Sequence, residues 1–267
     1  MRNMFSSTSS KKRGLDVQTL QPRIVAGNGR SISILELLLA HGWDINWRNT
    51  SSSTVDAEPF MWHIVDDGKL VAWCLDHDAS VFPKHQEPLQ DDEITISQMI
   101  CSQVLERAAA RADVETFELL RSKGAPLGWR PLHLAVQTAA FHTRREETET
   151  GFEEMEPSRA RMLEKRMDMV RHLIDVVGLD VNAPDYPGGR KYQDRLGTPI
   201  CYLAHEEGLH HTKELTWLLL DRGADPTPGL EEAESSGHET FAKDVEAWKA
   251  QCGSSSQRSD SGKCIVQ

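Results

Sequence analysis

Histidine and cysteine are side chains that can bind a metal ion, and cysteine can also act as a nucleophile. His205, His210 and His211 fall within one short segment, but spacings of five and six residues do not share a helix face, which disfavours a metal site. The cysteines are odd in number, and no two of them form a C-x-x-C pair. This pattern predicts free thiols in a reducing compartment, with no disulfide framework and no zinc ligands.

Motifs for catalysis or cofactor binding are missing as well. The stretch "AGNGRS" (26–31) has two glycines of a dinucleotide-binding fingerprint but lacks the third, and we expect it between two helices instead of after a strand. No phosphate-binding P-loop, nucleophile elbow or H-E-x-x-H zinc motif occurs. Carboxylates are expected on exposed faces, where their pKa values would not be raised. The sequence therefore predicts a protein that is not an enzyme, with no catalytic residue, metal, cofactor or small-molecule substrate.

The C-terminal end carries a signal for lipidation. The last four residues, "CIVQ" (264–267), resemble a C-a-a-X prenylation box, and the terminal glutamine favours a farnesyl group on Cys264. Residues 251–267 are predicted to form a flexible tail that could enter a transferase. Because one lipid chain gives only marginal membrane binding, Cys252 is a candidate palmitoylation site for a second signal. The alternatives are an incidental C-terminus and an unmodified Cys252.

The charge of the chain restricts its partners. With 30 Lys and Arg against 41 Asp and Glu, the formal net charge is −11. This charge argues against a nucleic-acid partner and against adhesion of the body to anionic lipid. No apolar run is long enough for a transmembrane helix, and residues 1–17 are predicted to be a disordered arm with no secretory signal. We expect a cytoplasmic protein, peripheral on a membrane if lipidated; "KKR" (11–13) makes a nuclear location the minor alternative.

A repeated pattern in the sequence predicts pairs of helices along most of the chain. An apolar helical stretch closed by glycine and a polar turn occurs at 35–46, 117–128, 170–182 and 216–228. A fifth copy, at 71–82, has Asp78 in the glycine position, where a left-handed conformation is needed. A second helix is predicted upstream of each copy, and these helices are expected to begin at Pro22, Pro59, Val104, Pro131 and Pro199. One such helix pair cannot bury its apolar face alone, so the pairs must stack.

Several of these segments resemble the ankyrin repeat. The residues that carry the resemblance are "RPLHLA" (130–135), "GTPICYLA" (197–204) and "LLLDRGADP" (218–226). The resemblance implies an all-α helical solenoid of about five repeats plus a C-terminal capping half-repeat over 18–250, with the half-repeat turning at Gly237 and His238. It also implies that His133 is structural and hydrogen-bonds across neighbouring turns. An unrelated helical bundle is the alternative.

Two departures from the repeat, and the tips of its loops, are candidates for partner binding. A charged insertion at about 138–165 is predicted to form an acidic turn that leads into an extended outer helix, either as a solvated bulge or as a binding protrusion. A long loop spans about 182–197. Trp43 is expected to be packed. The partner-binding candidates are aromatic and arginine side chains at predicted loop tips: Trp47, Arg48, Trp129, Arg130, Tyr186, Arg190 and Tyr192.

These observations favour a non-enzymatic adaptor that binds another protein through its loop tips and inner helices and carries a C-terminal farnesyl group. One alternative is a soluble cytosolic or nuclear co-regulator whose C-terminus is incidental. A second alternative is an auxiliary factor that acts on an enzyme of a small-molecule pathway.

Overall fold

The computed structural model describes residues 17–28, 30–47, 58–82, 103–143, 147–148, 151–152, 156–185, 196–205 and 211–255. Within these residues the chain is all-helical apart from one short antiparallel pairing between β1 (Glu147–Thr148) and β2 (Gly151–Phe152). The predicted all-α class is therefore confirmed for the described part of the chain.

The helices form pairs, each with an inner and an outer member. After a short 3-10 helix η1 (Val17–Thr19), the inner helices are α1 (Pro22–Asn28), α3 (Phe60–His63), α6 (Val104–Arg111), α8 (Pro131–His142), α10 (Pro199–His205) and α12 (Pro226–Ser236). The outer helices are α2 (Ile32–Ala40), α4 (Gly68–Asp76), α7 (Val114–Ser122), α9 (Pro157–Asp175), α11 (Lys213–Asp221) and α13 (Glu239–Ser255).

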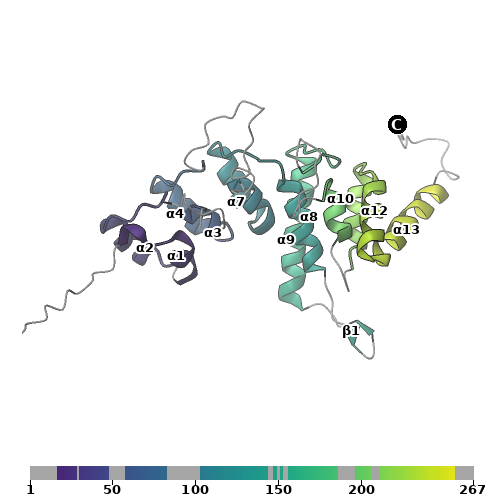
Figure 1. The fold of residues 1–267 in the computed structure, drawn as a ribbon, viewed down its shortest axis with the longest axis horizontal. Helices are drawn as coiled ribbons and strands as arrows, with labels where there is room; N and C mark the ends of the chain where they lie inside the picture. Colours follow the sequence, from purple (N-terminus) through teal and green to yellow (C-terminus); the bar gives the residue numbers. More distant parts are fainter. Residues whose placement is uncertain are drawn as a thin grey trace, which may run out of the picture.

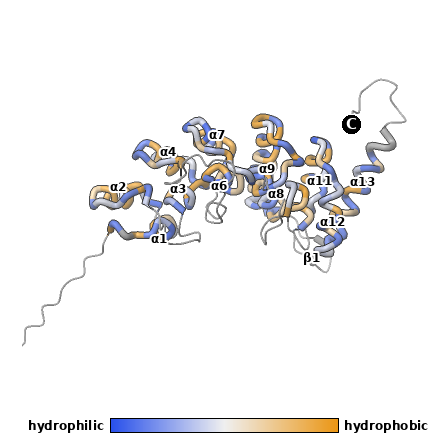
Figure 2. Tube along the Cα trace, turned by 45° about the horizontal axis from the view of Figure 1, so that its top comes forward, coloured by the Kyte–Doolittle hydropathy of each residue, from blue (hydrophilic) through white to orange (hydrophobic). Residues whose placement is uncertain are grey.

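The pairs follow one another along the long axis of the molecule, with α1 and α2 at one end and α13 at the other (Figure 1). Each inner helix contacts the inner helix of the next pair, from α1 to α12. On the outer side, α4 contacts α7, α7 contacts α9, and α11 contacts α13. Figure 2 shows the outer helices as an upper row and the inner helices as a lower one. The fold is thus a two-layer array with two long edges.

The two edges differ in the chain segments that form them. We call the loops that follow the outer helices the tip edge, since each of these loops leads to the next inner helix. The segments that join an inner helix to its outer partner form the turn edge. Because the two helices of a pair are antiparallel, the tip edge and the turn edge lie at opposite ends of the helices.

Left-handed residues close the outer helices at the predicted positions. The backbone φ angle is positive at Gly42, Gly124, Gly178 and Gly223, with values of 78 to 87°. Asp78 has a φ of 59°, and it is the non-glycine residue with positive φ in the described part of the chain. Its place in the pattern was predicted from its tolerance of this conformation, and the prediction is confirmed.

The starts of the inner helices also follow the sequence. Pro22, Pro131 and Pro199 are the first residues of α1, α8 and α10, where a missing N–H group costs no hydrogen bond. Val104 begins α6, and Pro59 immediately precedes α3. Proline therefore marks the end of a tip loop wherever it occurs in the repeated pattern.

Small inner residues and leucine-rich outer helices make the core. In α6 and α8 the alanines that face neighbouring pairs are buried, which lets these helices approach closely. Leu35, Leu120, Leu173 and Leu219 of the outer helices are fully buried. This division between small and large apolar residues is the one that the sequence predicted.

The insertion and the C-terminal region depart from the regular unit. α9 is 19 residues long and begins at Pro157, so the predicted extended outer helix is confirmed, whereas the β1–β2 pairing was not predicted. At the C-terminus, α12 and α13 form a complete helix pair where a capping half-repeat was predicted, and the predicted turn at Gly237 and His238 is confirmed between the two helices. α13 also continues to Ser255, past the boundary predicted at residue 250, and the Trp248 indole N–H donates to Asp221 at 2.8 Å, which ties α13 to α11.

Candidate protein-binding cleft

A cleft of about 400 Å³ opens between two neighbouring loops of the tip edge. One wall consists of Gly128, Trp129 and Pro131–His133, and the other of Leu179, Asp180, Ala183 and Pro184. Most of these side chains are apolar. The cleft thus lies where α8 begins and where α9 has ended, at the junction of two consecutive helix pairs.

The first wall is held in place by Glu106, a buried residue of α6. Its Oε1 atom accepts hydrogen bonds from the backbone N–H groups of Trp129 and Arg130, both at 2.9 Å, and its Oε2 atom accepts one from Gln103 N–H at 3.0 Å. Gly128 has a φ of 72°, and a Cβ atom there would lie 2.6 Å from Glu106 Oε1. Glycine is therefore required at 128 by both its conformation and its closeness to this carboxylate.

Trp129 projects from this wall with 40% of its surface exposed. Its backbone is held by Glu106, so the indole is presented from a rigid loop. Arg130, the other predicted binding residue on this loop, points elsewhere: its guanidinium lies over the Tyr202 ring, 5.5 Å from the centroid. The cation of Arg130 therefore packs on the next helix pair instead of lining the cleft.

A buried polar group of three side chains supports both walls. The Tyr202 hydroxyl donates to the buried Asp185 carboxylate, which also accepts the Gly197 N–H at 3.3 Å. Burial and this hydrogen bond raise the pKa of Tyr202. The His133 ring lies edge-on to Tyr202, with the centroids 5.3 Å apart.

His133 connects the two walls. It is 1% exposed, and its Nε2 atom donates to the Ala183 carbonyl at 3.0 Å. Burial lowers the pKa of His133 to about 4, so the imidazole is neutral at neutral pH. The structural role predicted for His133, a hydrogen bond across neighbouring turns, is confirmed.

Asparagine side chains form hydrogen bonds between neighbouring tip loops, and these bonds were not predicted from the sequence. Asn182 donates through Nδ2 to the Gly223 carbonyl at 2.9 Å and accepts the Asp225 N–H at 2.8 Å. Asn46 makes the same two contacts with the next loop, to the Asp78 carbonyl at 2.9 Å and from the Ser80 N–H at 2.7 Å. The signal was present as "GWDIN" (42–46) and "GLDVN" (178–182), in which aspartate and asparagine follow the closing glycine at equal offsets.

The remaining predicted residues are distributed as follows. Trp43 is packed, as predicted: it is 2% exposed and meets Phe60 edge-on at 5.3 Å. Trp47 is half-buried at the first tip loop. Phe82, which was not predicted, is 51% exposed at the second tip loop and adds an aromatic side chain to this edge. Cys252 lies within α13, but its side chain is outside the described residues, as are Arg48, Tyr186, Arg190, Tyr192 and Cys264.

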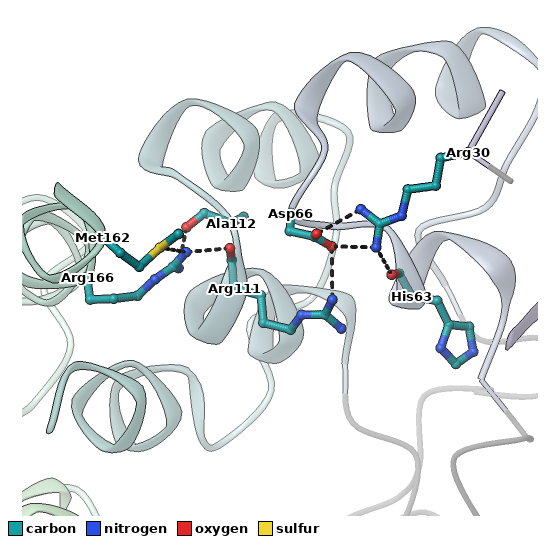
Figure 3. A network of polar contacts seen from close by, with 7 residues as sticks. All are labelled: Arg30, His63, Asp66, Arg111, Ala112, Met162 and Arg166. Carbon is teal, nitrogen blue, oxygen red and sulfur yellow. Dashed lines mark hydrogen bonds and ion pairs between the residues drawn. The ribbon is translucent and has the colours of Figure 1, made fainter. Parts of the chain in front are cut away.

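The turn edge carries a charged network that links consecutive pairs (Figure 3). Arg30 donates to both carboxylate oxygens of Asp66, at 2.7 and 3.2 Å, and to the His63 carbonyl at 3.2 Å. Arg111 donates to the same carboxylate at 3.0 Å. Burial alone would raise the pKa of Asp66, but the Arg30 hydrogen bond and the charges of both arginines outweigh it and hold that pKa below its usual value.

Arg166 extends this network to the next pair. It is 5% exposed, and its Nη1 and Nη2 atoms donate to the carbonyls of Ala112 and Arg111 at 2.7 and 2.6 Å. These carbonyls lie at the end of α6, where no intrahelical donor remains. Asp168 lies as many residues before its closing glycine, Gly178, as Val114 lies before Gly124. Val114 is the first residue of α7, so a regular outer helix would begin at Asp168. Arg166 therefore belongs to the part of α9 that the insertion added.

The expectation that carboxylates lie on exposed faces was wrong for several residues. Glu58, Glu106, Asp185 and Glu232 are buried. Glu58 pairs with Arg107 at 2.7 Å, and Glu232 pairs with His205 at 2.7 Å. Each buried carboxylate has a partner in a neighbouring helix or loop, a pairing that single-sequence reading could not reveal. Among the described residues, no group of three or more His, Cys, Asp or Glu side chains could hold a metal ion.

Two further observations concern membrane insertion and similarity to known proteins. None of the described helices is long and apolar enough to cross a membrane. Comparison of the sequence with protein-family models gives no match, and comparison with curated proteins finds no relative.

Proposed function

We propose that this chain is a non-enzymatic adaptor built as an ankyrin-type solenoid, and that it binds a segment of another protein in the cleft beside Trp129. The observation that carries this proposal is a preformed apolar cleft with a rigidly held, partly exposed indole at its rim.

The ankyrin-type reading is supported by repeated geometry. Left-handed residues close successive outer helices, inner helices stack on inner helices, and Asn46 and Asn182 bridge successive loops in the same way. Helix pairs that stack in this manner form a continuous core, and their loops are free to vary with the partner.

The binding role is supported by the physics of interfaces. Tryptophan is enriched at binding hot spots, where it contributes most when it enters or borders an apolar pocket. Because Glu106 already fixes the loop, little conformational entropy would be lost when a partner binds. The candidates Trp129 and Trp47, with Phe82, give the tip edge aromatic side chains on several loops.

A peptide selection on the full-length chain tests this function. Random twelve-residue peptides displayed on phage are selected on the wild type, and the winners are assayed on Trp129→Ala and on Phe141→Ala. Phe141 is a matched control because it is exposed on α8, outside the cleft lining. We expect peptides that bind the wild type and Phe141→Ala but lose about tenfold or more in affinity with Trp129→Ala. Winners that are indifferent to Trp129 would contradict the proposal.

We further propose that Cys264 is farnesylated, which would place the adaptor at a membrane surface in the cytoplasm, with Cys252 as the candidate for a second lipid. One lipid chain gives weak, exchangeable membrane binding, and the net charge of −11 opposes stronger attachment. The test is the intact mass of the protein from a eukaryotic cell beside a Cys264→Ser control. A gain of one farnesyl group with loss of the last three residues supports the proposal. An unmodified mass, in cells that prenylate a reporter, favours the soluble cytosolic or nuclear co-regulator.

A further inference from the structure

The polar groups of the cleft restrict what can bind there. His133 is neutral, and its Nε2 atom is used by Ala183, so this imidazole offers the occupant no charge. Asp180 is the charged residue of the lining, and it is exposed. Its Oδ1 atom accepts the Asn182 N–H at 2.8 Å, so the carboxylate is held in one orientation at the rim. A carboxylate fixed in this way needs no reordering to accept a cation.

Two arginines of the described tip loops have partners other than this carboxylate. The Arg130 guanidinium is stacked on Tyr202. Arg222, at the following tip loop, donates to both oxygens of Asp175, at 3.1 and 3.0 Å. Lys123 is an exposed cation at the preceding loop, but it is not part of the lining. Among the described residues, the lining therefore presents a negative charge to an occupant.

The next tip loop also carries an exposed carboxylate. Asp225 stands at the same offset from its closing glycine as Asp180, and it accepts the Thr227 N–H at 2.9 Å. It is exposed, as is Asp78 at the second tip loop. Together with the net charge of −11, these carboxylates would attract a basic segment and repel an acidic one.

The size of the cleft restricts the occupant further. About 400 Å³ is near the lower end of the volumes that hold small ligands, and it suits one or two large apolar side chains instead of a folded element. An extended segment could place such a side chain between the walls while its neighbours reach the rim carboxylate.

From the apolar walls, the volume of the cleft and the carboxylate at its rim, we propose that the partner segment carries a lysine or arginine beside the aromatic or aliphatic residue that enters the cleft. The cation of this lysine or arginine would form an ion pair with Asp180. This inference rests on the proposed function and adds the chemistry of the partner. An acidic or neutral segment would meet the same apolar walls but would lose the contact with the rim.

The phage selection described above also tests this chemistry. The winning peptides are sequenced, resynthesised with a fluorescent label, and titrated against the full-length wild type, Asp180→Asn and Glu231→Gln. Asparagine keeps an oxygen that can accept the Asn182 N–H, so the loop is retained. Glu231→Gln is the matched control, because this exposed glutamate lies on α12, away from the cleft.

We expect winners enriched in lysine or arginine next to an aromatic or aliphatic residue. Their affinity should fall about two- to fivefold with Asp180→Asn, the range for one exposed ion pair, and should be unchanged with Glu231→Gln. It should also fall as sodium chloride is raised. Winners that need Trp129 but are acidic or neutral, or that are indifferent to Asp180→Asn, would overturn this inference and leave the proposed function standing. Winners that are indifferent to Trp129 would overturn both.

Discussion

The turn edge and the tip edge of this array use their polar groups in opposite ways. At the turn edge, Arg30, Asp66, Arg111 and Arg166 join four consecutive helix pairs through charged and backbone contacts. At the tip edge beside α8, buried polar groups hold the loops from behind and leave apolar surface and Trp129 facing solvent. The polar groups of the turn edge pair with one another, whereas those of the tip edge order a cleft that is proposed to bind a partner.

The contrast predicts that stability and recognition depend on different edges of the array. Nearest-neighbour contacts hold the pairs in register, so residues that link pairs should contribute mainly to the free energy of unfolding. Residues that project from loops fixed by other residues should contribute mainly to binding. Substitutions on the two edges can therefore be compared directly, by denaturation and by peptide affinity.

Arg166→Ala should cause the largest loss of stability. The buried Ala112 carbonyl and the partly buried Arg111 carbonyl at the end of α6 would each lose a charged donor at about 2 kcal/mol, so the free energy of unfolding should fall by about 4 kcal/mol. The measurement is urea denaturation of the full chain, followed by circular dichroism. Arg161→Ala is the control: this exposed residue of α9 contacts the Pro157 carbonyl within its own helix, and its removal should cost below about 0.5 kcal/mol. Equal midpoints for the two variants would show that the extension of α9 does not stabilise the turn edge.

His133 should make stability depend on pH at the tip edge. Its pKa is near 6.5 in the unfolded chain and about 4 in the folded one, so between these values the unfolded state binds more protons. Stability should therefore be full above pH 6.5 and fall as the pH drops to 4, by up to about 3 kcal/mol from this residue. The readout is the difference in pH dependence between wild type and His133→Gln, measured by denaturation. Parallel curves across this window would mean that the imidazole is not held neutral by burial.

Asp66→Asn should have a smaller effect, because its ion pairs with Arg30 and Arg111 are partly exposed. We expect a loss of about 1 kcal/mol that shrinks as sodium chloride is raised to 0.5 M. Asp168→Asn serves as control, since Asp168 pairs with Arg171 on the surface of α9. A salt-independent loss would assign the effect to the hydrogen-bond geometry instead of the charge.

Trp129→Ala should have the smallest effect on stability, below about 1 kcal/mol, because much of the indole is already in contact with water. The same substitution should give the largest loss of peptide affinity. Denaturation and fluorescence titration of one preparation measure both quantities. A large loss of stability would make Trp129 part of the core and would remove the contrast between the two edges.

The starts of the inner helices, the closing residues of the outer helices and the buried leucines between them can be read from the sequence alone. Proline at a helix start, and glycine or Asp78 in a left-handed closing position, act within a few residues, so a single sequence is enough to read them. The periodic leucines likewise marked buried positions of the outer helices α2, α7, α9 and α11.

Tertiary structure alone decided which side chains meet. Trp129 and Leu179 line one cleft only because the start of α8 and the end of α9 come together across an insertion. The position of the Arg130 guanidinium over the Tyr202 ring could not be read from the sequence, and Glu106 was expected to be exposed, yet it is buried and orders the cleft wall. Backbone preferences depend on near neighbours in sequence, whereas a hydrogen-bond partner depends on how the pairs stack.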